Sequence, residues 1–219
     1  MVERIFEYII RQQIEIDDMQ FGFMKGKGTT DAIFMVRQMQ ENFRVKGKKL
    51  YFGFVYLQNA FDRVPREVIS WAMRKLGVKE WLVSAVMSMY TGAKTVVRTV
   101  YGSSKGFEVK VGMHQGSALS PLLFVIVMEA ISREFRVALP WELLYVDDLV
   151  VIAETEEELI KRLNEWKDNV ESKGITVSMN KTKVMISGER QKVKKCIEYE
   201  VEGPRPKRTW REVVREDVK

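Results

Sequence analysis

The chain has 219 residues, of which 46% are hydrophobic and 30% are charged, with a net charge of +6. This composition suffices to bury one core or two small lobes, excludes a disordered chain, and weakly favours a polyanionic partner. A single cysteine (Cys196) and a single histidine (His114) exclude a disulfide framework and make an internal zinc site implausible.

The first half of the chain predicts helices on either side of one strand. Apolar positions at helical spacing, possible caps at 29–31, and Pro65, which suits a first helical turn, indicate the helices. The strand comprises residues 50–57, which are mainly aromatic or apolar. A basic, glycine-rich loop at 24–28 precedes the second helix. The expected helices cover residues 1–14, 29–45, 65–77 and 81–90.

The second half predicts hairpins and two long helices. A tight hairpin is expected where two apolar runs are separated only by Asp147-Asp148, which places two carboxylates at its tip. Together the elements favour an α+β fold, with an antiparallel sheet covered by helices on one face. The expected elements are a hairpin over 95–111, a helix from Ser120 toward Arg136, the tight hairpin over 143–152, a helix over 156–172, and strands at 175–179 and 183–187.

No other local feature points to chemistry as directly as Asp147 and Asp148. Adjacent aspartates repel each other, and a bound cation would offset that repulsion. Magnesium prefers carboxylate and phosphate oxygens, and phosphoryl-transfer sites commonly hold two such ions. An ordinary aspartate-rich turn explains the local pattern equally well, because aspartate favours turns.

Five short segments occur in a fixed order along the chain. They are MQFGF at 19–23 with KGKGTTD at 25–31, FVYLQNAFD at 54–62, HQGSALSP at 114–121, YVDD at 145–148, and GI at 174–175 with NKTK at 180–183. In this order they resemble the motifs of the reverse transcriptases of non-LTR (LINE-type, RTE-like) retrotransposons. The resemblance implies a right-hand polymerase with fingers and palm, acting as an RNA-directed DNA polymerase, which is a nucleotidyltransferase.

The resemblance also implies a division of the chain. Relative to the family, the thumb, the cysteine-rich segment and the N-terminal endonuclease are absent, so we expect a truncated copy. The expected parts are fingers at 1–49, a first palm segment at 50–93, a fingers-side hairpin at 94–112, a second palm segment at 113–188, and a basic tail at 189–219.

In this family Asp147 and Asp148 are expected to bind Mg²⁺ and act in catalysis. The other principal metal ligand is an aspartate of the first palm motif, and here that position is Tyr56. A phenol with an ordinary pKa of about 10 is neutral at physiological pH and is a poor magnesium ligand. Asp62 is not expected to substitute, because matching family members carry an aspartate there as well. We therefore expect polymerase activity to be lost or strongly reduced.

The resemblance assigns further roles around the incoming nucleotide. Phe61 would exclude a 2′-hydroxyl, Gln115 and Gly116 would line the nucleotide pocket, and Lys181 (or Lys183) would act on the departing pyrophosphate. Each also has a plain alternative: core packing for Phe61, an ordinary loop before a helix for Gln115 and Gly116, and solvated side chains for the lysines. His114 is expected at the surface.

Lys25 and Lys27, on the glycine-rich loop, would grip phosphates of the nucleotide or template, or are simply surface charges. The partners implied by the family are an RNA template, an RNA–DNA hybrid and deoxynucleoside triphosphates. The N-terminus lacks the features of a signal peptide and the longest apolar run is too short to span a bilayer, so a nuclear or cytoplasmic protein without a membrane partner is expected. Two alternatives to an active polymerase stay open: a non-catalytic nucleic-acid-binding remnant, and a decayed reading frame with no role.

Overall fold

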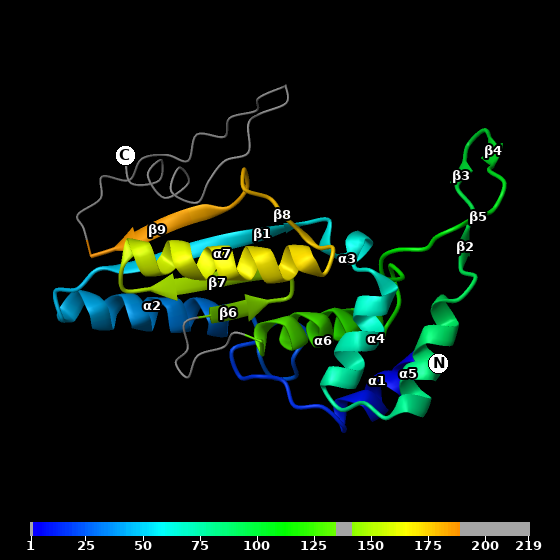
Figure 1. Cartoon of the computed structure of the whole chain (residues 1–219), viewed down its shortest axis with the longest axis horizontal. Helices are drawn as coiled ribbons and strands as arrows, with labels where there is room; N and C mark the ends of the chain where they lie inside the picture. Colours follow the sequence, from blue (N-terminus) through cyan, green and yellow to red (C-terminus); the bar gives the residue numbers. More distant parts are fainter. Residues whose placement is uncertain (1, 135–141, 189–219) are drawn as a thin grey trace.

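The computed structural model describes residues 2–134 and 142–188, and its centre is a five-stranded antiparallel sheet (Figure 1). The long strand β1 pairs with β7 along one edge, and with β9 and then β8 along the other, while β6 pairs with β7. The strands of this sheet are β1 (Leu50–Gln58), β6 (Glu142–Tyr145), β7 (Asp148–Ala153), β8 (Thr176–Val177) and β9 (Lys183–Ser187).

Seven helices are described around this sheet. They are α1 (Val2–Arg11), α2 (Thr29–Val45), α3 (Ala60–Arg63), α4 (Arg66–Lys75), α5 (Glu80–Tyr90), α6 (Ser120–Ser132) and α7 (Glu156–Ser172). Side-chain caps explain two of their starts, of which only the one at 29–31 was predicted from the sequence. Thr155 accepts a hydrogen bond from the Glu158 amide at 3.2 Å, and the Asp31 side chain accepts one from the Gly28 amide at 2.7 Å.

One face of the sheet is packed against the main hydrophobic core. Val55 and Leu57 of β1 join this core, together with the apolar faces of α4, α5, α6 and α7. Gly53 lies on the same face, and a Cβ built there would lie 3.1 Å from the Leu163 side chain of α7. The close approach of α7 to β1 therefore requires a residue without a side chain at this position.

The opposite face of the sheet is covered only at one end. Leu50 and Phe52 are fully buried there in a second core with Phe21 and apolar side chains of α2. Farther along the same face, Phe54 is 37% exposed and Gln58 is exposed. This face therefore opens to solvent toward the end of β1 that carries Tyr56.

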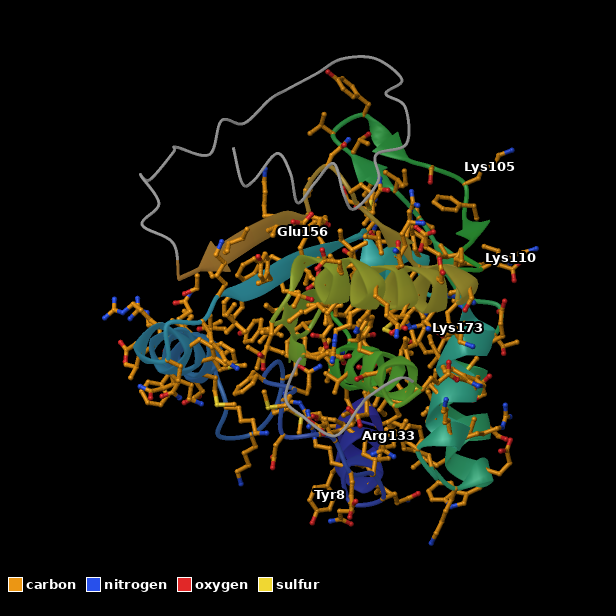
Figure 2. The ribbon with its side chains drawn as sticks, turned by 60° about the vertical axis from the view of Figure 1, so that its left-hand side comes forward. Tyr8, Lys105, Lys110, Arg133, Glu156 and Lys173 are labelled. Carbon is orange, nitrogen blue, oxygen red and sulfur yellow. The ribbon has the colours of Figure 1, made fainter. Side chains whose placement is uncertain are left out.

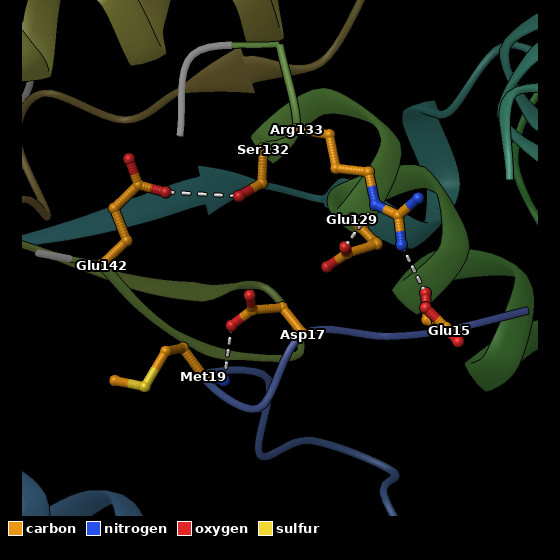
Figure 3. A network of polar contacts seen from close by, with 7 residues as sticks. All are labelled: Glu15, Asp17, Met19, Glu129, Ser132, Arg133 and Glu142. Atoms are coloured by element: carbon orange, nitrogen blue, oxygen red, sulfur yellow. Dashed lines mark hydrogen bonds and ion pairs between the residues drawn. The ribbon is translucent and has the colours of Figure 1, made fainter. Parts of the chain in front are cut away.

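A polar network ties the segment before α2 to the end of α6 (Figure 3). The buried Glu129 carboxylate accepts from Arg133 Nε at 2.7 Å, and Arg133 Nη2 donates to the Glu15 carbonyl at 2.6 Å. Ser132 donates to Glu142 of β6 at 3.3 Å. Because α6 and β6 are both core elements, this network fixes where the chain enters the fingers motif at residue 19.

The α+β class with an antiparallel palm sheet is confirmed, although details differ from the expectation. The hairpin expected over 95–111 forms two short ladders, β2 (Lys94–Thr95) with β5 (Phe107–Glu108) and β3 (Arg98–Thr99) with β4 (Gly102–Ser103). Every residue from 94 to 108 is exposed, so no core supports longer pairing. The strand expected at 175–179 is shortened to Thr176–Val177.

The basic tail at 189–219, Cys196 and Arg136 lie outside the described residues. Among the helices that are described, none combines the length and apolar character needed to cross a membrane.

Candidate functional site

The turn between β6 and β7 carries the paired carboxylates, but not in the arrangement expected. Val146 and Asp147 form the turn, while Asp148 is the first residue of β7 and is exposed. The backbone of Val146 is left-handed, with φ of 61°. This conformation is unusual for a residue with a β-branched side chain, and the local sequence does not indicate it. The sequence therefore predicted both aspartates at the tip of the hairpin, whereas Val146 takes one of the two turn positions.

Strand register brings Asp148 between two tyrosines. Asp148 lies directly opposite Tyr145 of β6 and directly opposite Tyr56 of β1. Residues directly opposite each other in an antiparallel sheet project from the same face. The three side chains therefore form a row on the open face of the sheet, and position 56 adjoins the carboxylate pair as the resemblance implied.

The electrostatics of this row disfavour two adjacent negative charges. Partial burial of its carboxyl group, together with the charge of Asp147, raises the pKa of Asp148 above its ordinary value. A nearby cation would reverse both effects by stabilising the ionised form.

Tyr56 is half-buried and is held by the loop that follows β8. Its amide donates to Thr182 Oγ1 at 3.4 Å, and its carbonyl accepts from the Ser178 amide at 2.8 Å. Lys181 Nζ lies 4.5 Å from the centroid of the Tyr56 ring, close enough for a cation–π contact. Of the two candidate lysines, Lys181 thus contacts the site, whereas Lys183 lies in β9, opposite Phe54.

The loop before α6 lies against the segment after β1. The Met113 amide donates to the Phe61 carbonyl at 2.8 Å. At Gly112, with φ of 81°, a Cβ would lie 2.7 Å from the Asp62 carbonyl oxygen. Glycine is therefore required at position 112 both for the backbone conformation and for this close approach.

This approach brings together three of the predicted nucleotide-pocket positions. Gln115 Nε2 donates to Asp62 Oδ1 at 2.8 Å, so Asp62 is engaged by an amide. The half-buried Phe61 ring stacks on the buried Phe124, with centroids 4.5 Å apart. Gly116 is exposed and has φ of 77°. Phe61 therefore packs on the core, as the alternative to a nucleotide-binding role predicts, but its ring stays partly accessible to solvent.

His114, expected at the surface, is only partly exposed. The His114 ring is half-buried and stacks on Tyr90 with centroids 4.3 Å apart. The His114 carbonyl accepts from Ser120 Oγ at 2.7 Å. Its contacts hold the start of α6 against the end of α5, a positioning role that sequence alone did not reveal.

The two lysines of the glycine-rich loop have different environments. Lys27 Nζ forms an ion pair with Asp18 Oδ1 at 2.9 Å and lies 5.6 Å from the Phe21 ring centroid. The hydrogen bond from Lys27, followed by its charge, lowers the pKa of Asp18. Lys25 is exposed. Lys27 therefore contributes to the shape of the loop itself, and Lys25 is the freer of the two for a phosphate.

Gln20 contacts the site, but sequence reasoning gave it no role. It is fully buried, and its Oε1 accepts from the amides of Gly22 at 2.8 Å and of Val146 at 3.3 Å. The neighbouring Phe21 amide donates to the Leu144 carbonyl at 2.8 Å, which adds residues 19–21 as a short edge to β6. The only signal was its place in the motif at 19–23, since the contact to the turn between β6 and β7 is distant in sequence.

The donors around the turn do not match a two-ion magnesium site. Within residues 2–134 and 142–188, no three or more His, Cys, Asp or Glu side chains gather as a metal site would require. Asp147 and Asp148 supply two carboxylates, whereas the adjoining position on β1 supplies a neutral phenol. Hard divalent cations favour charged oxygen donors.

Comparison with known proteins identifies the relatives. The family model described as reverse transcriptase (RNA-dependent DNA polymerase) matches residues 1–207. The chain is 27% identical over 190 residues to a Pol polyprotein of the type-1 retrotransposable element R2 of Nasonia vitripennis, covering 82% of this chain. It is also 27% identical over 207 residues to that of the type-2 element R2DM of Drosophila melanogaster, covering 89%. The chain spans only 18% and 19% of these two relatives.

Solved structures show the same fold. Telomerase from Candida tropicalis, in complex with a TWJ fragment of telomeric RNA, matches with a TM-score of 0.65 and 16% identity, over 84% of this chain and 33% of that one. The relatives named are R2 elements, so the finer RTE-like assignment stays a prediction. With its motifs in order, its palm sheet and a family match over nearly its whole length, the chain belongs to the reverse transcriptase (RNA-dependent DNA polymerase) family and is similar to the reverse transcriptase domains of retrotransposons.

Proposed function

We propose that this chain forms the fingers and palm of a non-LTR retrotransposon reverse transcriptase whose DNA synthesis is strongly reduced. The observation that carries this proposal is the register that sets Tyr56 opposite Asp148. The fingers and palm boundaries at residues 49, 93, 112 and 188 belong to the proposal. Its partners are an RNA template, an RNA–DNA hybrid and deoxynucleoside triphosphates.

The reduction follows from the chemistry of the donors. Reverse transcriptases use divalent ions, and Mg²⁺ is the ion proposed for Asp147 and Asp148. Two bridging ions need carboxylates from both neighbouring strands, and the phenol of Tyr56 supplies no charge. The half-buried ring also occupies space beside Asp148, and the contact with Lys181 favours that placement.

The remaining site residues keep the roles that the family implies. Phe61, Gln115 and Gly116 would surround the sugar and base of the incoming nucleotide, and Lys181 would neutralise charge on pyrophosphate. Their support is the packing of residues 112–115 against Phe61 and Asp62, together with the position of Lys181 over Tyr56.

A second candidate function is nucleic-acid binding without catalysis. It is favoured by the same Tyr56, which removes a metal ligand but leaves the open face of the sheet and the net charge of +6 intact. Such binding weakens steeply as salt rises, because phosphate contacts release counterions.

Primer extension on an RNA template tests the proposal, with the chain run beside Tyr56→Asp and Tyr56→Phe. We expect Tyr56→Asp to extend at least about 100-fold faster than the other two, because a complete metal site contributes several kcal/mol to transition-state stabilisation. Adding Asp147→Asn to the Tyr56→Asp variant should abolish the gain.

Equal extension by the unaltered chain and Tyr56→Asp would overturn the proposed reduction. If neither extends but both bind RNA with steep salt dependence, the second candidate function is the better account.

A further inference from the structure

An arm formed by residues 94–111 projects from the body of the protein beyond α5 (Figure 1). It contains β2, β3, β4 and β5, and its residues 94–108 are all exposed. Near its tip, Val100 and Tyr101 are 94% and 98% exposed. A two-stranded ribbon with no core of its own is only marginally stable in water, so these apolar side chains indicate a partner.

The base of the arm is fixed beside the candidate nucleotide pocket. The Arg66 guanidinium donates to the Tyr90 carbonyl, at the end of α5 that leads into the arm, and to the Val109 carbonyl in the returning part of the arm. It also lies 5.3 Å from the Tyr90 ring centroid. The Tyr90 ring in turn stacks on His114, which adjoins Gln115. A strand that leaves the pocket would therefore meet the arm.

The charge of the arm suits a polyanion. The arm carries four cations and one acidic residue, Glu108, which lies 3.8 Å from Lys110. Figure 2 shows Lys105 and Lys110 along the arm, directed away from the body of the protein. The cations are Lys94, Arg98, Lys105 and Lys110.

The aromatic side chains of the arm further restrict the class of polyanion that it can bind. Tyr101 at the tip and Phe107, which is 48% exposed, offer ring faces between these cations. Aromatic rings stack on bases that are not already stacked in a duplex, and cationic side chains track the backbone of the same strand. A protein partner would be expected to match the apolar residues without needing the surplus of positive charge.

We propose that the arm docks single-stranded RNA, the part of the template that has not yet entered the site. This inference rests on the proposed function, since it assumes an RNA template, and it assigns the place where the unpaired strand is held.

Fluorescence anisotropy with an unstructured oligouridine tests the proposal on the full chain. Tyr101→Ala should weaken binding by about 5- to 100-fold, the range for loss of one base-stacking ring. The double variant Arg98→Ala with Lys105→Ala should make the slope of log K against log salt shallower by about 1.4, because two phosphate contacts are lost. The matched controls, Tyr8→Ala and the pair Lys79→Ala with Lys161→Ala, should bind as the unaltered chain does.

Other outcomes separate the arm from the proposed function. If no variant, nor the unaltered chain, binds RNA at any salt, nucleic-acid binding itself is wrong. If the unaltered chain binds RNA and the arm variants bind equally well, only the arm proposal fails. Three further results would also overturn the arm proposal. The arm variants could lose as much affinity for an RNA–DNA hybrid duplex as for oligouridine, or could lose affinity for oligothymidine alone. The unaltered chain could also self-associate in a way that Tyr101→Ala abolishes.

Discussion

Tyr56 and Asp148 lie opposite each other on two neighbouring strands of the palm sheet, so each residue is part of the other's environment. Asp148 carries a pKa raised by partial burial and by Asp147, with no charged ligand beside it on β1. Lys181 instead contacts the Tyr56 ring. The row therefore places one carboxylate, Asp148, beside two phenols and next in sequence to a second carboxylate, Asp147.

The pH dependence of stability should reveal the strain at Asp148. Since its pKa is raised above the ordinary 3.8, the folded chain keeps this proton to a higher pH than the unfolded chain does. The free energy of unfolding therefore falls as pH rises from the unfolded pKa through the folded one. We expect Asp148→Asn to be more stable than the unaltered chain at neutral pH, and the difference to vanish below the unfolded pKa. Urea denaturation across pH measures this, and a pH-independent difference would contradict it.

Gln20 acts at the same turn from the opposite side. Replacing it with methionine keeps the volume but removes the acceptor for the Gly22 and Val146 amides. Buried donors without a partner cost about 1–3 kcal/mol. Gln20 Nε2 itself has no hydrogen-bond partner in the described part of the chain, so its loss offsets part of that cost.

We therefore expect Gln20→Met to lower the free energy of unfolding by about 1–2 kcal/mol in chemical denaturation. The control is Gln40→Met, where the amide donates to Met185 Sδ at 3.6 Å and to no other described residue. Its effect should stay within about 0.5 kcal/mol. If both variants are equally stable, Gln20 does not hold the turn.

At the scale of elements, the arm depends on one side chain for its attachment. Arg66→Met removes the donors to the Tyr90 carbonyl at the end of α5 and to the Val109 carbonyl of the arm. Hydrogen bonds from charged groups contribute about 1.5–3 kcal/mol. We expect amide exchange at Val109, whose N–H donates to Ala93, to accelerate by roughly 10-fold or more.

Arg74→Met is the matched control, because Arg74 is exposed on the same helix and pairs with Glu80. Exchange at Val109 should be unchanged in that variant and exchange within α6 unchanged in both. Acceleration throughout α6 in Arg66→Met would mean that Arg66 supports the core and not the arm specifically.

Sequence patterns predicted those elements whose causes are local. The strand at β1 and the helix at α7 follow from composition and apolar spacing, and their observed bounds lie within a residue of the prediction. The strands of the arm are shorter than predicted. Turn residues indicate a hairpin, but they do not indicate whether a core supports longer strands. Its clamp by Arg66 joins segments that no local pattern connects.

At the scale of the whole molecule, the motif order predicted the fold, while the roles of Asp147, Asp148 and Tyr56 stay predictions. The contacts that bring motifs together were beyond sequence reasoning. The Gln20 acceptor, the Gly112 approach to Asp62 and the stack of His114 on Tyr90 each join residues distant along the chain. Their geometry depends on how the sheet and α6 pack, and periodicity carries no information on that packing.

The close packing of Gly22 against the turn between β6 and β7 limits how such polymerases can be recombined. A Cβ at Gly22 would lie 2.3 Å from Val146 Cγ2 and 2.5 Å from the Val146 amide nitrogen. Any side chain at position 22 would therefore push the turn, and Asp147 with it, out of place. A chimera that joined this fingers loop to the palm of another retroelement would have to inherit both partners of this contact from the same parent.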